Sequence, residues 1–159
     1  KSIFLKIAKR TLLLFGIGLF LNVIPEFNFS SIRIPGVLQR IAIVFFINAL
    51  LFLTTSRNTQ ITISAVLLLL YWVLLSFVPF NGQIPTELTP DNNLSGFIDA
   101  ILLKGHMWSV TGTWDPEGLL STMPAVVSTT FGMIAGSYLK QHQFNKTAVT
   151  NKKEKESHR

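Results

Sequence analysis

The chain has no cysteine and few charged residues, and each shortage narrows the classes of protein it fits. Without cysteine, disulfide bridges and thiol chemistry are excluded, and metal sites lose their commonest soft ligand. Only 14% of the 159 residues are Asp, Glu, Lys or Arg, whereas a soluble domain carries about 25%. We therefore expect no metal site and too little polar surface to cover a soluble fold.

Apolar residues are abundant instead, and they gather in four stretches without charge. A helix needs about 20 apolar residues to cross a bilayer, with a range of about 17–25. Two stretches are long enough alone, and two become so if flanking Lys and Arg reach the interface. A soluble helical core is the alternative that we disfavour. The sequence predicts an all-α fold, a multi-span transmembrane helical bundle with about four spans, at residues 7–24, 37–54, 61–78 and 119–139.

The distribution of charge predicts an orientation for these spans. With the N-terminus inside, eleven basic and two acidic residues face the cytoplasm, a net charge of +9. Three basic and six acidic residues then lie outside, a net charge of −3. Cytoplasmic loops of membrane proteins are enriched in Lys and Arg, so this threading is favoured. The excess of basic residues is therefore explained by membrane topology. The sequence has no basic face interleaved with residues that contact bases, so it does not point to nucleic-acid binding.

The connections complete the expected organisation. Residues 1–139 form a partial transmembrane domain, whose long outer loop spans residues 79–118. Within that loop, residues 95–104 have the apolar spacing of a short amphipathic helix that lies on the membrane. Residues 140–159 are polar and predict a mobile cytoplasmic loop or tail. The whole reads as a piece of a larger membrane protein.

Two arginines and a glutamine near the second span are candidates for substrate binding. Arg33 lies just outside the span, and Gln39 and Arg40 lie in its first turn. A charge at that depth needs a partner, because an unpaired one costs roughly 2.5 kcal/mol or more in hydrocarbon. The partner is a polar substrate or an outer acid such as Glu117 or Asp99, and the sequence leaves both open.

A second group of candidates lies in the outer loop. Trp114, Asp115 and Glu117 combine carboxylates with a ring that can stack on a sugar. Asp115 before a proline is also typical of a helix N-cap, with Glu117 in the first turn. His106 has the side chain best suited to proton transfer near neutral pH, yet a lone loop histidine usually only forms hydrogen bonds.

Two further loop residues join this group. Trp108 follows His106 closely and adds a second aromatic ring. Asp99 lies in the short amphipathic helix, and we expect it to pair with Lys104 or an arginine.

The motifs together resemble one known family. Residues 33–41 (RIPGVLQRI), followed by residues 112–122 (GTWDPEGLLST), resemble the heparan-α-glucosaminide N-acetyltransferase family of multi-span membrane proteins. Residues 96–99 (GFID) and 102–106 (LLKGH) fit the same pattern. The resemblance covers about residues 6–139, and bacterial members are often described as acyltransferases or N-acetylglucosamine-related transporters.

The resemblance implies a transmembrane acetyltransferase that takes acetyl-CoA as co-substrate and acetylates a terminal glucosamine amine on the extracytoplasmic side. The alternatives are an amino-sugar transporter or a structural membrane subunit. The family's catalytic histidine lies in a loop that no position here matches, so the catalytic residue is unknown and this fragment is expected to be inactive alone. Expected partners are the lipid bilayer, an amino sugar, the remaining spans and a second copy. The expected location is the bacterial inner membrane, with the N-terminus and the polar tail cytoplasmic.

Overall fold

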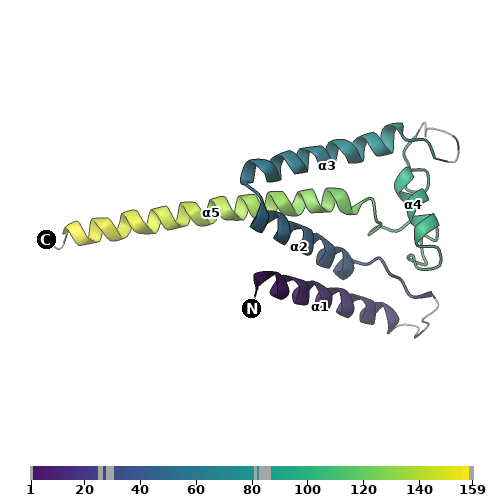
Figure 1. Ribbon diagram of the computed structural model, residues 1–159, viewed down its shortest axis with the longest axis horizontal. Coiled ribbons are helices and arrows are strands. Elements are labelled where there is room, and N and C mark those ends of the chain that lie inside the picture. The colour runs from purple at the N-terminus through teal and green to yellow at the C-terminus, as the bar shows by residue number, and fades with distance from the viewer. Residues whose placement is uncertain (1, 25–26, 28–30, 81, 83–86, 158–159) are drawn as a thin grey trace.

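The computed structural model describes residues 2–24, 27, 31–80, 82 and 87–157 (Figure 1). Within these residues the chain is all-helical, and it forms five helices and no strand. The helices are α1 (Ile3–Val23), α2 (Val37–Thr54), α3 (Arg57–Phe77), α4 (Leu94–Leu102) and α5 (Thr122–Ser157).

The four long helices alternate in direction along the bundle (Figure 1). α1 packs against α2, and α5 packs against both α2 and α3. The N-terminus, the α2–α3 turn and the C-terminal part of α5 extend toward one side of the figure. The α1–α2 loop and the α3–α5 connection meet at the opposite end, where the short helix α4 lies across the bundle. This loop end holds most of the candidate residues.

Side-chain caps explain where three of the helices begin. Ser2 accepts a hydrogen bond from the Leu5 N–H and starts α1. Ser56 does the same for the Thr59 N–H, so α3 begins at Arg57, four residues earlier than the predicted span. The side-chain oxygen of Asn93 accepts from the Gly96 N–H and starts α4. Such caps satisfy backbone donors that have no partner within the helix.

The predicted bounds are confirmed for α2 and differ for α5. α2 occupies the predicted residues, Val37–Thr54. We expected a span over residues 119–139 and a mobile tail, but α5 begins at Thr122 and runs for 36 residues to Ser157. Its polar second half is rich in Lys, Gln and Glu, which are strong helix formers, and no Gly or Pro interrupts it after Gly136.

The helix predicted at residues 95–104 is present as α4, one residue earlier at its start and two residues shorter at its end. It stops before Gly105, whose φ of 81° lies in the left-handed region that ends helices. Its buried face consists of Leu94, Gly96 and Asp99, and its exposed residues include Ile101 and Leu102. α4 therefore packs against the neighbouring loop by a mixed face that includes one buried carboxyl group.

Two of the five helices, α2 and α3, are long and apolar enough to cross a membrane by length and composition among the described residues. Core helices of soluble proteins have similar compositions, but they are mostly buried. Only 22% of the α2 window and 11% of the α3 window are buried inside this fold. α1 carries three basic residues in its first half, and Ser, Thr and Gly dilute the apolar half of α5.

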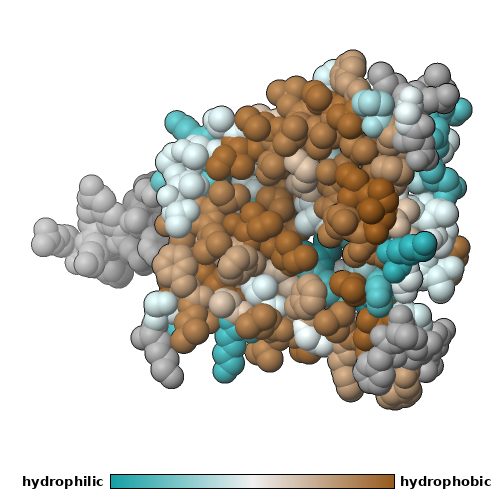
Figure 2. Space-filling model, turned by 45° about the vertical axis from the view of Figure 1, so that its right-hand side comes forward, coloured by the Kyte–Doolittle hydropathy of each residue, from teal (hydrophilic) through white to brown (hydrophobic). Residues whose placement is uncertain are grey.

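Several polar side chains are buried inside the bundle, and many large hydrophobic side chains are exposed outside it. Asn48, Ser64 and Thr130 are almost fully buried, and the Thr130 hydroxyl donates to the side-chain oxygen Oδ1 of Asn48 at 2.6 Å between α2 and α5. Large hydrophobic side chains such as Phe20 and Leu69 are exposed on the outer faces of the helices. Figure 2 shows this apolar surface along the middle of the bundle, with paler and teal surface toward its ends.

Candidate functional site

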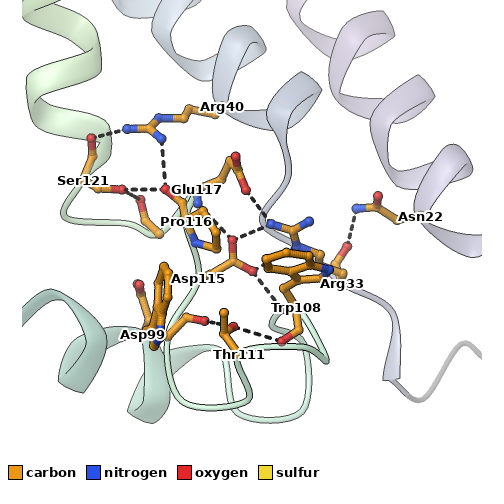
Figure 3. A network of polar contacts seen from close by, with 12 residues as sticks. Asn22, Arg33, Arg40, Asp99, Trp108, Thr111, Asp115, Pro116, Glu117 and Ser121 are labelled. Atoms are coloured by element: carbon orange, nitrogen blue, oxygen red, sulfur yellow. Dashed lines mark hydrogen bonds and ion pairs between the residues drawn. The ribbon is translucent and has the colours of Figure 1, made fainter. Parts of the chain in front are cut away.

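An ion-pair cluster joins the loop before α2 to the loop before α5 (Figure 3). The Arg33 guanidinium donates to both carboxylate oxygens of Asp115, at 2.7 and 3.0 Å, across 82 residues of sequence. The same guanidinium also donates to a carboxylate oxygen of Glu117. Glu117, which the sequence proposed as a partner for the arginine inside the second span, pairs with Arg33 instead. One arginine thus meets two carboxylates, and the cluster carries one excess negative charge.

Asp115 is the centre of this cluster. Its side chain is 0% exposed, and its oxygens also accept from the backbone N–H groups of Trp108 at 2.9 Å and Glu117 at 3.0 Å. Burial alone raises the pKa of Asp115, but the bonds from Arg33 and from these two N–H groups outweigh it and leave the pKa below its usual value. Asp115 is therefore an ionised structural anchor.

The helix cap predicted at Asp115 is wrong. Asp115 does accept from the N–H two residues ahead, but α5 begins only at Thr122. The intervening residues form turns because Arg33 and Arg40 hold their polar groups outside a helix.

Arg33 is positioned from several sides. Its own carbonyl accepts from the Asn22 side chain at 2.8 Å, and its guanidinium lies 5.5 Å from the centre of the Trp108 ring. Burial lowers the pKa of Arg33, whereas Asp115 and Glu117 raise it and determine the net upward direction. The arginine therefore stays charged and ties α1, the first loop and the second loop together.

Arg40 makes a different set of contacts. It donates to the backbone carbonyls of Pro116 at 3.1 Å and of Ser121, and so holds the turns that precede α5. Its Nε is buried without a hydrogen-bond partner, and no acid lies within ion-pair distance of it in the described part of the chain. The ion pair that we considered for this arginine is therefore absent there.

Asp99 does not pair with Lys104 or an arginine as expected. It is fully buried in α4, where Oδ1 accepts from the Leu119 N–H at 3.0 Å and Oδ2 has no hydrogen-bond partner. Gly118 makes this approach possible, because a Cβ there would lie 1.9 Å from Oδ2. Burial raises the pKa of Asp99, and repulsion from Asp115 adds to the rise. Asp99 is thus harder to ionise than a solvent-exposed aspartate.

His106 and Gln39 are placed by hydrogen bonding and packing. The His106 ring nitrogen Nδ1 lies 2.8 Å from the Ile32 carbonyl, and the His106 carbonyl accepts from the Ile34 N–H at 2.9 Å. This is the hydrogen-bonding role that the sequence left open. Gln39 is buried against Gly18 between α1 and α2. It lines neither of the two cavities at the loop end, so its place as a substrate candidate is not supported.

Two cavities flank the ion-pair cluster at the loop end. One, of about 460 Å³, is lined by Asn22, Arg33, Met107 and Trp108 among others. The other, of about 360 Å³, is lined by Asp99, Trp114 and Asp115 together with side chains of α3 and the loop before α4. That second cavity also has several hydroxyl and amide groups at its wall, namely Tyr71, Thr89, Asn93, Ser95 and Ser121.

Sequence reasoning missed three contributors to the site. The Asn22 side chain donates to the carbonyl of Arg33, and Asn93 caps the start of α4. Gly118 leaves the space that the Asp99 carboxyl group occupies. A signal existed for Asn22, because it is a lone amide near the end of an apolar run. No local pattern distinguishes Gly118, since its role depends on a residue of another helix.

The cavity beside Asp99 offers carboxyl groups of opposite pKa tendency, an aromatic ring and neutral polar groups. These groups suit a small polyhydroxylated or amine-bearing ligand, since pockets of this kind fix orientation with a few placed polar groups. No group of three potential metal-ligating side chains occurs within the described ranges. Comparison with known proteins adds nothing further: no protein-family model matches the chain, and no curated protein matches it.

Proposed function

We propose that this chain is part of a four-span transmembrane acetyltransferase. It would move an acetyl group from cytosolic acetyl-CoA to the amine of an amino sugar, of the terminal glucosamine type, on the extracytoplasmic side. The observation that carries the proposal is the 360 Å³ cavity beside Asp99, Trp114 and Asp115, at the acidic end of an apolar bundle. The resemblance of residues 33–41 and 112–122 to glucosaminide acetyltransferases supplies the reaction.

The arrangement of apolar and polar groups supports membrane insertion. Exposed apolar area on this scale is unfavourable in water and favourable in lipid. Basic residues of α1 and the start of α3 lie at the end opposite the cavity, and the acids of the α3–α5 connection lie at the cavity end. The positive-inside rule then puts the cavity outside the cytoplasm.

The cavity has the groups that an amino sugar requires. The Trp114 ring is half-buried and can stack on the apolar face of a sugar. Asp115 is locked by four donors and is a poor base, whereas the Asp99 carboxyl has a raised pKa and an unpartnered Oδ2. Asp99 is therefore the more basic of the two carboxyls beside the cavity, and burial closes its Oδ2 to solvent.

The overall reaction is an acyl transfer. The amine nitrogen forms a bond to the acetyl carbonyl carbon, the carbon–sulfur bond of acetyl-CoA breaks, and the proton lost by the amine ends on the thiol of coenzyme A. His106 is held by the backbone at Ile32, which fits a structural role. In the proposal, the catalytic histidine comes from the family's loop that this chain does not match.

Sealed proteoliposomes that carry the full-length protein test this function. Acetylated glucosamine should form when acetyl-CoA is on the face of the basic end and the sugar is on the other face. Accumulation of labelled sugar without acetyl-CoA would show a transporter instead, and neither activity would show a structural subunit.

A substitution in the cavity makes the test specific. Trp114→Leu should raise the KM for glucosamine about threefold to tenfold, the range of an aromatic contact. Trp72→Leu is the matched control, since Trp72 is 56% exposed on α3 and does not line the cavity. An unchanged KM in a folded Trp114→Leu protein would contradict the proposal that this cavity binds the substrate.

A further inference from the structure

Arg40 remains outside the proposed acceptor site, and it stands at one end of a separate groove between α2 and α5. The groove has a volume of about 360 Å³. Its lining below Arg40 is nearly all apolar, with Asn48 and Thr129 as the polar exceptions: Ile41, Val44, Phe45, Asn48, Ala49, Ala125, Thr129 and Met133. The groove therefore combines one cationic end with an apolar body.

No carboxylate forms an ion pair with Arg40 within the described chain, although the neighbouring cluster of Arg33, Asp115 and Glu117 carries one excess negative charge. The two hydrogen bonds of Arg40 go to the carbonyls of Pro116 and Ser121. Its Nε is buried and unpartnered. A half-buried guanidinium without an ion-pair partner favours an anion, because carbonyl dipoles compensate its charge only in part.

The length of the groove indicates which apolar group fits beside the anion at Arg40. The α2 positions that line it run from Arg40 to Ala49, about 13 Å at 1.5 Å per residue. An extended alkyl chain that starts beside Arg40 can lie along this length against the apolar side chains of α2 and α5.

We propose that this groove holds one acyl chain of an anionic phospholipid, with the lipid phosphate at Arg40. Arg40 lies in the first turn of α2, at the depth where a headgroup meets the hydrocarbon when α2 crosses a bilayer. The inference rests on the membrane insertion in the proposed function and is independent of the acetyl transfer. The lipid would then brace the turns that Arg40 holds beside the acceptor cavity.

Native mass spectrometry of the full-length protein in detergent tests the inference, with phosphatidylglycerol and phosphatidylcholine of identical acyl chains as probes. The wild type and Arg40→Lys should retain phosphatidylglycerol preferentially. Arg40→Gln should lose about fivefold of this preference, the factor that one basic residue contributes near an anionic lipid. Arg57→Gln, at the other end of α2, is the matched control and should leave the preference unchanged.

A variant that leaves Arg40 in place guards against simple misfolding. Thr129 is exposed and lines the groove, so Thr129→Trp should block it and reduce the retention of both lipids. Thr62→Trp, at an exposed position of α3 outside the groove, should change neither. Unchanged retention in both Arg40→Gln and Thr129→Trp would overturn the proposal, as would displacement of the lipid by millimolar glycerol phosphate. Release of the protein from membranes by alkaline carbonate would instead contradict membrane insertion itself.

Discussion

The hydrogen-bond pattern of Asp115 leads to a specific prediction about stability. Each of its oxygens faces two donors: Arg33 Nε and the Trp108 N–H on one, and the second Arg33 nitrogen and the Glu117 N–H on the other. Asp115→Asn must therefore turn an amide NH₂ toward existing donors. Arg33→Gln removes the cation and leaves a fully buried carboxylate with only its two backbone donors.

The magnitudes follow from burial. Breaking a buried ion pair by removing one partner costs about 3–5 kcal/mol. Asp115 keeps two backbone N–H donors, so we expect about 3 kcal/mol for Arg33→Gln. Asp115→Asn should cost about 1–3 kcal/mol, because Glu117 still balances Arg33 and the loss is one of hydrogen bonding. The double variant should cost little more than the larger single one, a coupling of about 2 kcal/mol.

Thermal unfolding in detergent measures these changes, with tryptophan fluorescence as the probe because Trp108 lies over Arg33. For a chain of this size, about 3 kcal/mol corresponds to a fall in Tm of about 6–12 °C. Glu117→Gln, whose side chain is 17% exposed, should lower Tm by much less. Additive losses in the double variant, or a fall below about 2 °C for Arg33→Gln, would refute the role assigned to this pair.

Two further predictions concern the contact of Asp99 with Gly118. Gly118→Ala should destabilise the fold by about 1–3 kcal/mol through overpacking, and a second substitution, Asp99→Ala, should restore the stability. Gly132 on α5 has open space around it, so Gly132→Ala is the control and should be neutral or stabilising in the same thermal unfolding experiments. The pKa of Asp99 is higher in the folded state than in the unfolded state, so protonation favours folding. The stabilising effect of Asp99 is complete below about pH 4 and is lost as pH rises through its folded pKa. Over that pH range, the Tm of the wild type should fall relative to the Tm of Asp99→Asn. Parallel pH curves would contradict the buried state of Asp99.

The sequence was sufficient for the helices but not for the site. Long charge-free stretches predicted all four long helices, and the bounds of α2 were matched to the residue, because apolar runs and the Pro35-Gly36 turn signal define that helix locally. The starts of α1, α3 and α5 were missed because they depend on the Ser2 and Ser56 caps and on side chains that hold the turns before Thr122.

The sequence proposed Glu117 as a partner for the arginine inside the second span, but Glu117 pairs with Arg33. Asp115 was expected either to cap a helix or to contact a substrate. A local motif favours the helix cap, whereas Arg33, which donates hydrogen bonds to Asp115, lies 82 residues earlier in the sequence. Asp99 shows the same limit, since Gly118 admits its carboxyl and Leu119 supplies its donor. Such contacts depend on how loops far apart in the sequence are placed beside each other. No local pattern in a single sequence predicts that placement.

The most direct test of the central claim uses the absence of cysteine in this chain. The claim is that the loop end, with its acidic cluster, lies outside the cytoplasm. Ser109→Cys places one thiol in an exposed position of the loop end, and Asn58→Cys places one at the exposed start of α3, at the opposite end. In intact cells, a membrane-impermeant maleimide should label Ser109→Cys at once and label Asn58→Cys only after permeabilisation. The reverse pattern, or equal labelling of both, would contradict the proposed topology and the acceptor site built on it.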